Sequence, residues 1–177
     1  RVPADPEVQQ IVEEAYRPHQ ATLNEEIGFT ETMLNRRDYW QSTMGNLVTD
    51  ALRERAGTDV SFFPAWRYGA TILPGKILAE DVYNVVPTDG KIVTYSMNGK
   101  VLKELVENIL QGVSGKDPYA RVGGDMIRFS GMKLDCNLRA KAGSKIRSMM
   151  IGGQPMDEEK EYSIASVHTR FQNNPMF

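Results

Sequence analysis

Residues 42–64, which read STMGNLVTDALRERAGTDVSFFP, predict a helix followed by a buried strand. A hydroxyl residue at its start can cap a helix, and the following apolar residues recur at helical spacing, which predicts a helix from about Thr43 to Ala56. The expected buried stripe of this helix consists of Met44, Leu47, Val48, Ala51 and Leu52. Gly57 is a natural helix end, and the apolar run at residues 60–63 predicts a buried strand that stops at Pro64.

Outside this stretch, helical and strand-like patterns are mixed along the chain. Apolar residues have helical spacing at residues 7–20, 76–86 and 100–110. Strand-like patterns occur at residues 27–34, 91–97, 126–134, 145–151 and 162–167. Residues 112–124 contain four glycines among 13 residues and are expected to form a loop. Because these elements do not alternate as regular βαβ units, we predict an α+β fold in which a mixed β-sheet is layered with helices.

Composition narrows the classes of protein and partner. The chain has 177 residues, of which 41% are hydrophobic and 25% charged, as expected for one soluble globular domain with a sizeable core. Its net charge of -2 does not indicate a nucleic-acid or membrane partner, and no apolar run approaches the roughly 18 residues of a membrane helix. The first residue is Arg1 rather than methionine, so we expect a mature form or an excised fragment.

Few residues could support metal or thiol chemistry. A dinuclear metal centre needs several His and Asp ligands, whereas this chain has only His19 and His168, far apart in the sequence. We therefore expect neither a metal site nor a catalytic residue within the chain. Cys136 is the single cysteine, which excludes an internal disulfide, and the preceding Asp135 argues against a lowered thiol pKa.

One candidate binding residue is Arg67, which lies between Trp66 and Tyr68 in the loop after the predicted strand. A guanidinium held between aromatic rings suits bidentate binding of an oxyanion. The alternative is a surface arginine that rests on the two rings.

A second candidate is the glycine-rich loop at residues 112–125. The glycines of this loop would allow backbone N–H groups to approach an anion, and Lys116 and Arg121 would add positive charge. The alternative is a connector without a ligand.

From about Glu25 to Val167 the sequence resembles the C-terminal domain of the 5′-nucleotidase superfamily. The resemblance rests on short motifs that occur in the same order over about 140 residues. These motifs are residues 44–52, the strand leading to Arg67, Met97-Asn98-Gly99, Phe129-Ser130-Gly131, and Gly153-Gln154-Pro155-Met156 before Tyr162.

Within that superfamily, the details resemble the thiosulfohydrolase of bacterial sulfur oxidation (SoxB) more than a nucleotidase. Residues 64–69 match its Pro-Gly-x-Arg-aromatic-Gly pattern except at Ala65, and Met126 stands where nucleotidases have a base-stacking Phe. Further matches are Arg17-Pro18-His19, Arg36-Arg37, Asp117-Pro118-Tyr119, residues 123–128, and Cys136 followed by residues 143–146.

This resemblance implies a substrate-binding domain at residues 23–177, an interdomain connector helix at residues 1–22, and an N-terminal metallophosphoesterase domain that is absent here. That domain would hold two manganese or other divalent ions, so this chain alone would be inactive. A metal-activated water would release sulfate from a cysteine S-thiosulfonate on the arm of a periplasmic sulfur-carrier protein. The implied substrate-binding residues are Arg67, Trp66, Tyr68, Tyr119, Gly123, Gly124, Asp125 and Arg128.

Two other interpretations stay open. The same domain in a 5′-nucleotidase would bind a nucleotide between aromatic residues, for which Tyr119 and Phe171 are candidates. A stand-alone, non-catalytic binding module is the second.

Overall fold

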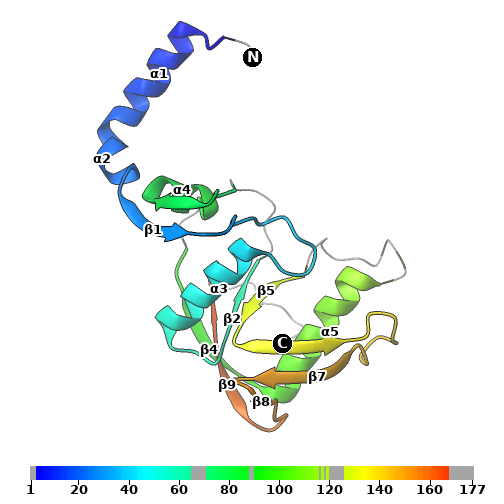
Figure 1. Ribbon diagram of the computed structural model, residues 1–177. Helices are drawn as coiled ribbons and strands as arrows, with labels where there is room; N and C mark the ends of the chain where they lie inside the picture. The colour runs from blue at the N-terminus through cyan, green and yellow to red at the C-terminus, as the bar shows by residue number, and fades with distance from the viewer. Residues whose placement is uncertain are drawn as a thin grey trace. The chain divides into compact units, whose positions relative to one another are not determined.

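The computed structural model describes residues 3–64, 71–87, 90–115, 117, 119 and 126–167. They belong to two compact units, which Figure 1 shows as ribbons. Unit 1 comprises residues 1–34 and 68–89, and unit 2 comprises residues 35–67 and 90–177.

Unit 1 combines helical segments with a two-stranded antiparallel sheet. Its elements are α1 (Pro6–Tyr16), a 3-10 turn (Arg17–His19), α2 (Gln20–Leu23), β1 (Glu26–Thr30), β3 (Gly75–Leu78) and α4 (Ala79–Val85). The predicted helix over residues 7–20 passes into the 3-10 turn where Pro18 has no N–H to donate. The Tyr16 hydroxyl donates to Glu80 Oε2 at 3.0 Å, which ties the helical segment to α4.

Two predictions for unit 1 were wrong. Residues 75–78 were expected in a loop and a helix, but they form β3, which pairs with β1. The strand expected to reach Leu34 ends at Thr30, and Leu34 forms an isolated bridge to Ile72 instead. The stripe of α1 is also exposed, since Val8, Ile11 and Val12 retain about 60% of their accessible surface, at 58%, 61% and 58%.

Unit 2 combines two sheets with helices, which confirms the α+β prediction. A mixed four-stranded sheet has the order β4-β9-β2-β5, with β2 parallel to β9 and antiparallel to β5. A separate antiparallel sheet has the order β6-β7-β8. The strands are β2 (Val60–Phe63), β4 (Val93–Asn98), β5 (Arg128–Ser130), β6 (Met132–Cys136), β7 (Ile146–Ile151), β8 (Gln154–Pro155) and β9 (Glu161–Ser166).

Two helices complete unit 2. The first, α3 (Thr43–Ala56), has the predicted bounds, with the Ser42 hydroxyl accepting from the N–H of Gly45 at 3.0 Å and Gly57 ending it at φ 66°. Its predicted stripe is only partly correct, because Leu47 and Ala51 are exposed whereas Thr49 is buried. The Thr49 hydroxyl donates to the Gly45 carbonyl at 2.9 Å, which satisfies it inside the core.

The longer helix α5 (Gly99–Ser114) continues four residues beyond its predicted end at Leu110. Asn98 caps it as expected, since its side chain accepts from the N–H of Lys100 at 3.0 Å. Figure 1 shows α5 beside the sheets of unit 2. Buried residues of this helix share one core with both sheets, and the extra turn adds Val113 to it. The predicted glycine-rich loop therefore starts after Ser114.

The break between β5 and β6 corrects the prediction of one strand over residues 126–134. Gly131 adopts φ +82°, and a Cβ atom added there would lie 2.0 Å from the carbonyl oxygen of Asp59. Beside it, the Ser130 hydroxyl donates to Asp50 and accepts from Arg53 Nε at 3.1 Å. The Ser-Gly motif therefore fastens β5 to α3 and sends the chain into the second sheet.

Candidate functional site

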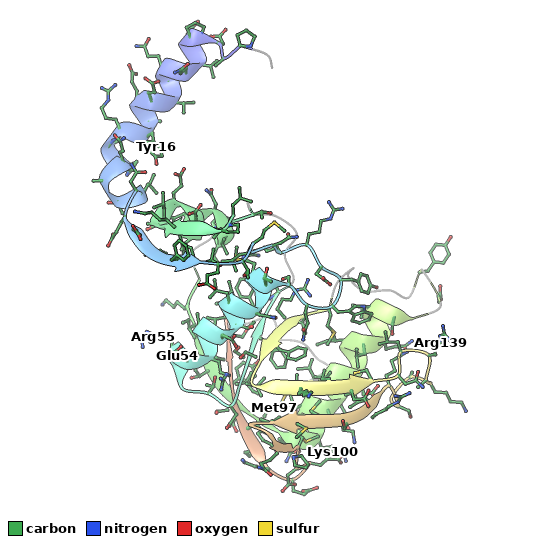
Figure 2. All side chains as sticks on the ribbon, in the orientation of Figure 1. Tyr16, Glu54, Arg55, Met97, Lys100 and Arg139 are labelled. Carbon is green, nitrogen blue, oxygen red and sulfur yellow. The ribbon has the colours of Figure 1, made fainter. Side chains whose placement is uncertain are left out.

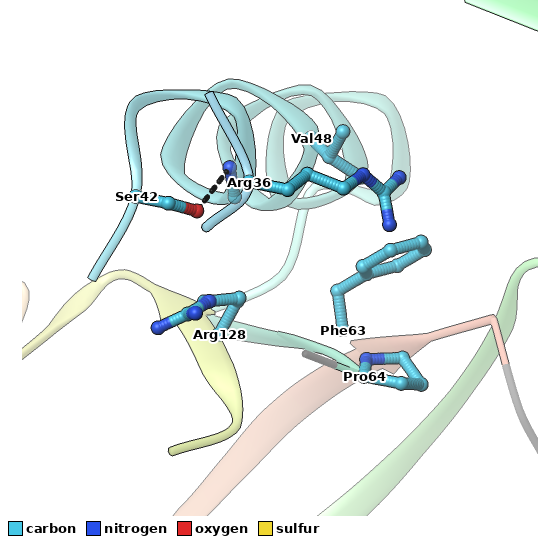
Figure 3. A pocket seen from close by; sticks show the side chains of 7 residues that line it. Arg36, Ser42, Val48, Phe63, Pro64 and Arg128 are labelled. Carbon is cyan, nitrogen blue, oxygen red and sulfur yellow. Dashed lines mark hydrogen bonds between the residues drawn. The ribbon is translucent and has the colours of Figure 1, made fainter. Parts of the chain in front are cut away.

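A small pocket in unit 2 lies where the loop before α3 meets the ends of β2 and β5 (Figure 3). Its lining consists of Arg36, Ser42, Gly45, Val48, Phe63, Pro64 and Arg128. The cavity measures about 10 Å³, which is room for about one water molecule or one ligand oxygen. In the sequence, Pro64 precedes Arg67 by three residues.

Two arginine side chains are buried in this pocket. Arg36 is 9% exposed, and its guanidinium carbon lies 5.5 Å from the centre of the Phe63 ring, in cation–π geometry. Arg128 is 4% exposed, and its Nη2 donates to the backbone carbonyl of Asp38. Both side chains are therefore fixed in position by contacts inside unit 2.

Gly45 gives Arg128 the space it occupies. A Cβ atom at this position would lie 2.7 Å from Ser42 Oγ and 2.8 Å from Arg128 Cγ. Glycine costs helix stability in the first turns of α3, and the passage of Arg128 is the physical reason for its presence here.

The chemistry of the pocket favours an anion. A guanidinium keeps its charge at all relevant pH values, and burial of that charge is costly unless a counter-charge or hydrogen bonds offset the cost. A planar or tetrahedral oxyanion matches the fork of N–H donors that two arginines present.

The segment between the pocket residues Arg36 and Ser42, called the rim below, carries an aromatic pair. Tyr39 and Trp40 make an edge-to-face contact with ring centres 4.8 Å apart, and they remain 41% and 37% exposed. The Tyr39 hydroxyl donates to the Val113 carbonyl at 2.6 Å, and the Tyr39 carbonyl accepts from the N–H of Met126 at 3.1 Å. The rim is thus anchored to the end of α5 and to the segment before β5.

Of the predicted site residues, the structure places Arg128 in this pocket and Tyr119 on the surface, where it is 98% exposed. The remaining ones lie outside the described residues: Arg67, Trp66, Tyr68, Gly123, Gly124 and Asp125, together with Lys116, Arg121, His168 and Phe171.

The prediction from sequence missed Arg36, Phe63, Tyr39 and Trp40 as site residues. The available signal was a double arginine followed by two adjacent aromatics, directly before a capped helix. Met126, the position at which the resemblance implies a base-stacking Phe in nucleotidases, is 3% exposed and belongs to the core. In this chain that position offers no surface for a base.

Other candidate chemistry is limited in the part of the chain that the structure describes. Burial, with smaller contributions from Asp135 and Glu107, raises the pKa of Cys136, as expected for an inert thiol. Within the described ranges, no three His, Cys, Asp or Glu residues come together as a metal site. No described helix is both long and apolar enough to cross a membrane.

Comparison with known proteins gives a consistent family match. A family model for the "5'-nucleotidase, C-terminal domain" matches residues 20–177. The solved structure of the sulfate thiohydrolase SoxB from Thermus thermophilus, in complex with glycerol, has a TM-score of 0.89 and 28% identity, covering 100% of this chain and 34% of that one. A 5′-nucleotidase precursor from the same species has a TM-score of 0.74 and 24% identity, covering 93% of this chain and 34% of that one.

Among curated proteins, the trifunctional nucleotide phosphoesterase YfkN of Bacillus subtilis is 24% identical over 155 residues, which is 83% of this chain and 10% of that protein. The NAD 5′-nucleotidase of Haemophilus influenzae is 26% identical over 109 residues, 55% of this chain and 17% of that protein. The chain thus spans about a third of the solved relatives (34%) and a smaller share of these curated ones.

Proposed function

The chain belongs to the family of 5′-nucleotidase C-terminal domains, and from this premise we propose that it binds the substrate for a two-domain metal-dependent hydrolase. Its solved relatives are about three times as long, since the chain covers 34% of each, which supports an N-terminal partner domain. Two manganese or other divalent ions on that domain, outside this chain, would supply the activated water.

The proposed substrate is a cysteine S-thiosulfonate on the arm of a periplasmic sulfur-carrier protein. Water adds its oxygen to the terminal sulfone sulfur, the adjacent sulfur–sulfur bond breaks, sulfate leaves, and the carrier retains a persulfide. The role of the present domain is to hold the sulfonate oxygens. Arg36 and Arg128, together with Arg67, which follows Pro64 by three residues in the sequence, are the proposed donors.

The observation that carries this proposal is the pair of buried guanidiniums in one pocket. The pocket has room for one oxygen of a sulfonate or phosphate, so it discriminates poorly between the two. The preference for the sulfur substrate is supported by the higher TM-score with SoxB, 0.89 against 0.74, and by the burial of Met126. A nucleotide is the second candidate, because the exposed pair Tyr39–Trp40 offers a ring surface for a base.

The test compares two reactions of the two-domain protein: sulfate release from a carrier thiosulfonate and phosphate release from AMP. We expect sulfate release, and we expect Arg128→Lys to lower kcat/KM by about 10- to 100-fold because it removes the guanidinium fork but keeps the charge. Arg55→Lys, on an exposed position of α3, is the matched control. Phosphate release from AMP without sulfate release would replace the sulfur substrate by a nucleotide.

A further inference from the structure

Unit 2 has a second hollow, which has no part in the substrate binding proposed above. It lies between the end of α5 and the turn that joins β6 to β7, and its volume is about 320 Å³, within the range of ligand-binding pockets. Three cationic residues, Arg139, Lys141 and Lys145, line it together with one carboxylate, Asp117. The hollow is therefore basic, although the whole chain has a net charge of -2.

The turn is held rigidly by two buried charged residues. Lys145 is 3% exposed, and its Nζ donates to the carbonyls of Leu138 at 2.6 Å and Ala140 at 3.4 Å. The carboxylate of Glu107, on α5, accepts from the backbone N–H groups of Lys145 at 3.0 Å and Ile146 at 2.7 Å. Hydrogen bonds within the turn and to α5 thus hold it in one conformation in the absence of a ligand.

The two outer cations are free to meet a partner. Arg139 and Lys141 are exposed, and among the described carboxylates neither has an ion-pair partner. One purely structural role is available to them, because cations stabilise the C-terminal end of a helix and the last turn of α5 carries no basic residue. If that were their only role, substitution of Arg139 or Lys141 would lower stability and leave binding unchanged.

A short series of contacts connects the arginine pocket to the hollow, because Arg128 of the pocket donates to the carbonyl of Asp38, the residue before Tyr39. Tyr39, on the rim of the arginine pocket, donates to the Val113 carbonyl, and the next residue, Ser114, lines the basic hollow. The basic hollow therefore lies next to the residues that hold the aromatic rim in place. A macromolecule can contact both places at once.

We propose that the basic hollow binds an acidic segment of the protein that carries the substrate. This inference rests on the proposed function and assigns a second contact to its macromolecular substrate. Electrostatic complementarity at a rim of this kind mainly raises the association rate and is weakened by salt. A small substrate without a folded carrier cannot reach the basic hollow, so its association rate does not depend on these cations.

The experiment measures KM of the two-domain protein for two substrates: the carrier thiosulfonate, and a short peptide whose cysteine bears the same thiosulfonate. The variants are Arg139→Glu and Lys141→Glu, and the control is Lys100→Glu. Figure 2 shows Lys100 and Arg139 toward opposite ends of α5, which as a 16-residue helix is roughly 24 Å long. The control therefore makes the same charge change away from the hollow.

For each hollow variant we expect KM for the carrier to rise roughly 5- to 10-fold at low salt, and the difference to shrink at about 0.5 M salt. KM for the peptide and kcat for both substrates should stay unchanged. A direct titration with a fluorescent peptide of ten glutamates should show the same loss of affinity in Lys141→Glu and none in Lys100→Glu.

Four results would overturn the proposal or the function on which it rests. If KM for the carrier rises equally in Lys100→Glu, the effect is one of net charge. If Arg139→Glu and Lys141→Glu lower only the melting temperature, the two cations stabilise the end of α5 and do not bind the carrier. Sulfate release by the wild type from neither substrate would overturn the proposed function and the carrier as partner, whereas wild-type activity with unaffected variants would overturn the basic hollow alone.

Discussion

Replacing Gly131 with alanine is expected to destabilise the fold by at least about 3 kcal/mol. The backbone at this position has φ +82°, where an alanine costs roughly 1–2 kcal/mol. The new Cβ would also lie 2.0 Å from the carbonyl oxygen of Asp59 and 2.8 Å from Arg53 Cδ. The arginine side chain can move, but the Asp59 backbone resists because Asp59 and Ser163 exchange three hydrogen bonds of 2.8–2.9 Å. Relief of the clash therefore disturbs the pairing of β2 with its neighbours.

The matched control is Gly143→Ala. This glycine has a similar φ of +74°, but nothing lies within 4 Å of its added Cβ. It should cost only the backbone strain, about 1 kcal/mol. Equilibrium urea unfolding, followed by circular dichroism, measures both variants against the wild type. Equal losses in the two variants, within about 0.5 kcal/mol, would refute the argument from close packing at Gly131.

Three further changes test the site and the core. Gly45→Ala should weaken anion binding by about 10-fold in a sulfate or phosphate titration, because its Cβ would lie 2.7 Å from Ser42 Oγ and 2.8 Å from Arg128 Cγ and would displace Arg128. The same crowding should lower stability by about 1–3 kcal/mol. Unchanged binding would remove Gly45 from the site. Asp59→Asn should lower the free energy of unfolding at neutral pH. It should also make the decrease of that free energy toward acid pH smaller than in the wild type, as measured by urea unfolding from pH 2 to 7. The reason is that hydrogen bonds from the backbone and side chain of Ser163 lower the pKa of Asp59, so its contribution is present above the unfolded-state pKa and lost as pH falls through the folded one. Tyr95→Phe should leave stability unchanged or raise it by up to about 1 kcal/mol, because the buried Tyr95 hydroxyl has no hydrogen-bond partner among the described residues. Burial also raises the pKa of this hydroxyl to about 12. A marked loss of stability in thermal unfolding would show that the hydroxyl has a partner.

The candidate site could be predicted only in part. Arg128 was identified through the motif around it, and it lines the pocket. Arg36 and Phe63 were not identified as site residues, because the double arginine and the apolar strand do not indicate in the sequence that these two side chains will meet. The contact between Arg128 and Asp38 joins residues 90 positions apart, so it depends on how α3, β2 and β5 pack together.

The sequence by itself determined the elements whose signals are local. The bounds of α3, its Ser42 cap, its end at Gly57 and the buried strand β2 all follow from residues within a few positions of one another, because caps and periodicity act over one or two helical turns. The tertiary structure alone decided the break at Gly131 and the extra turn of α5. Both depend on contacts with distant segments, namely the Asp59 carbonyl that leaves no room for a side chain and the shared core that buries Val113.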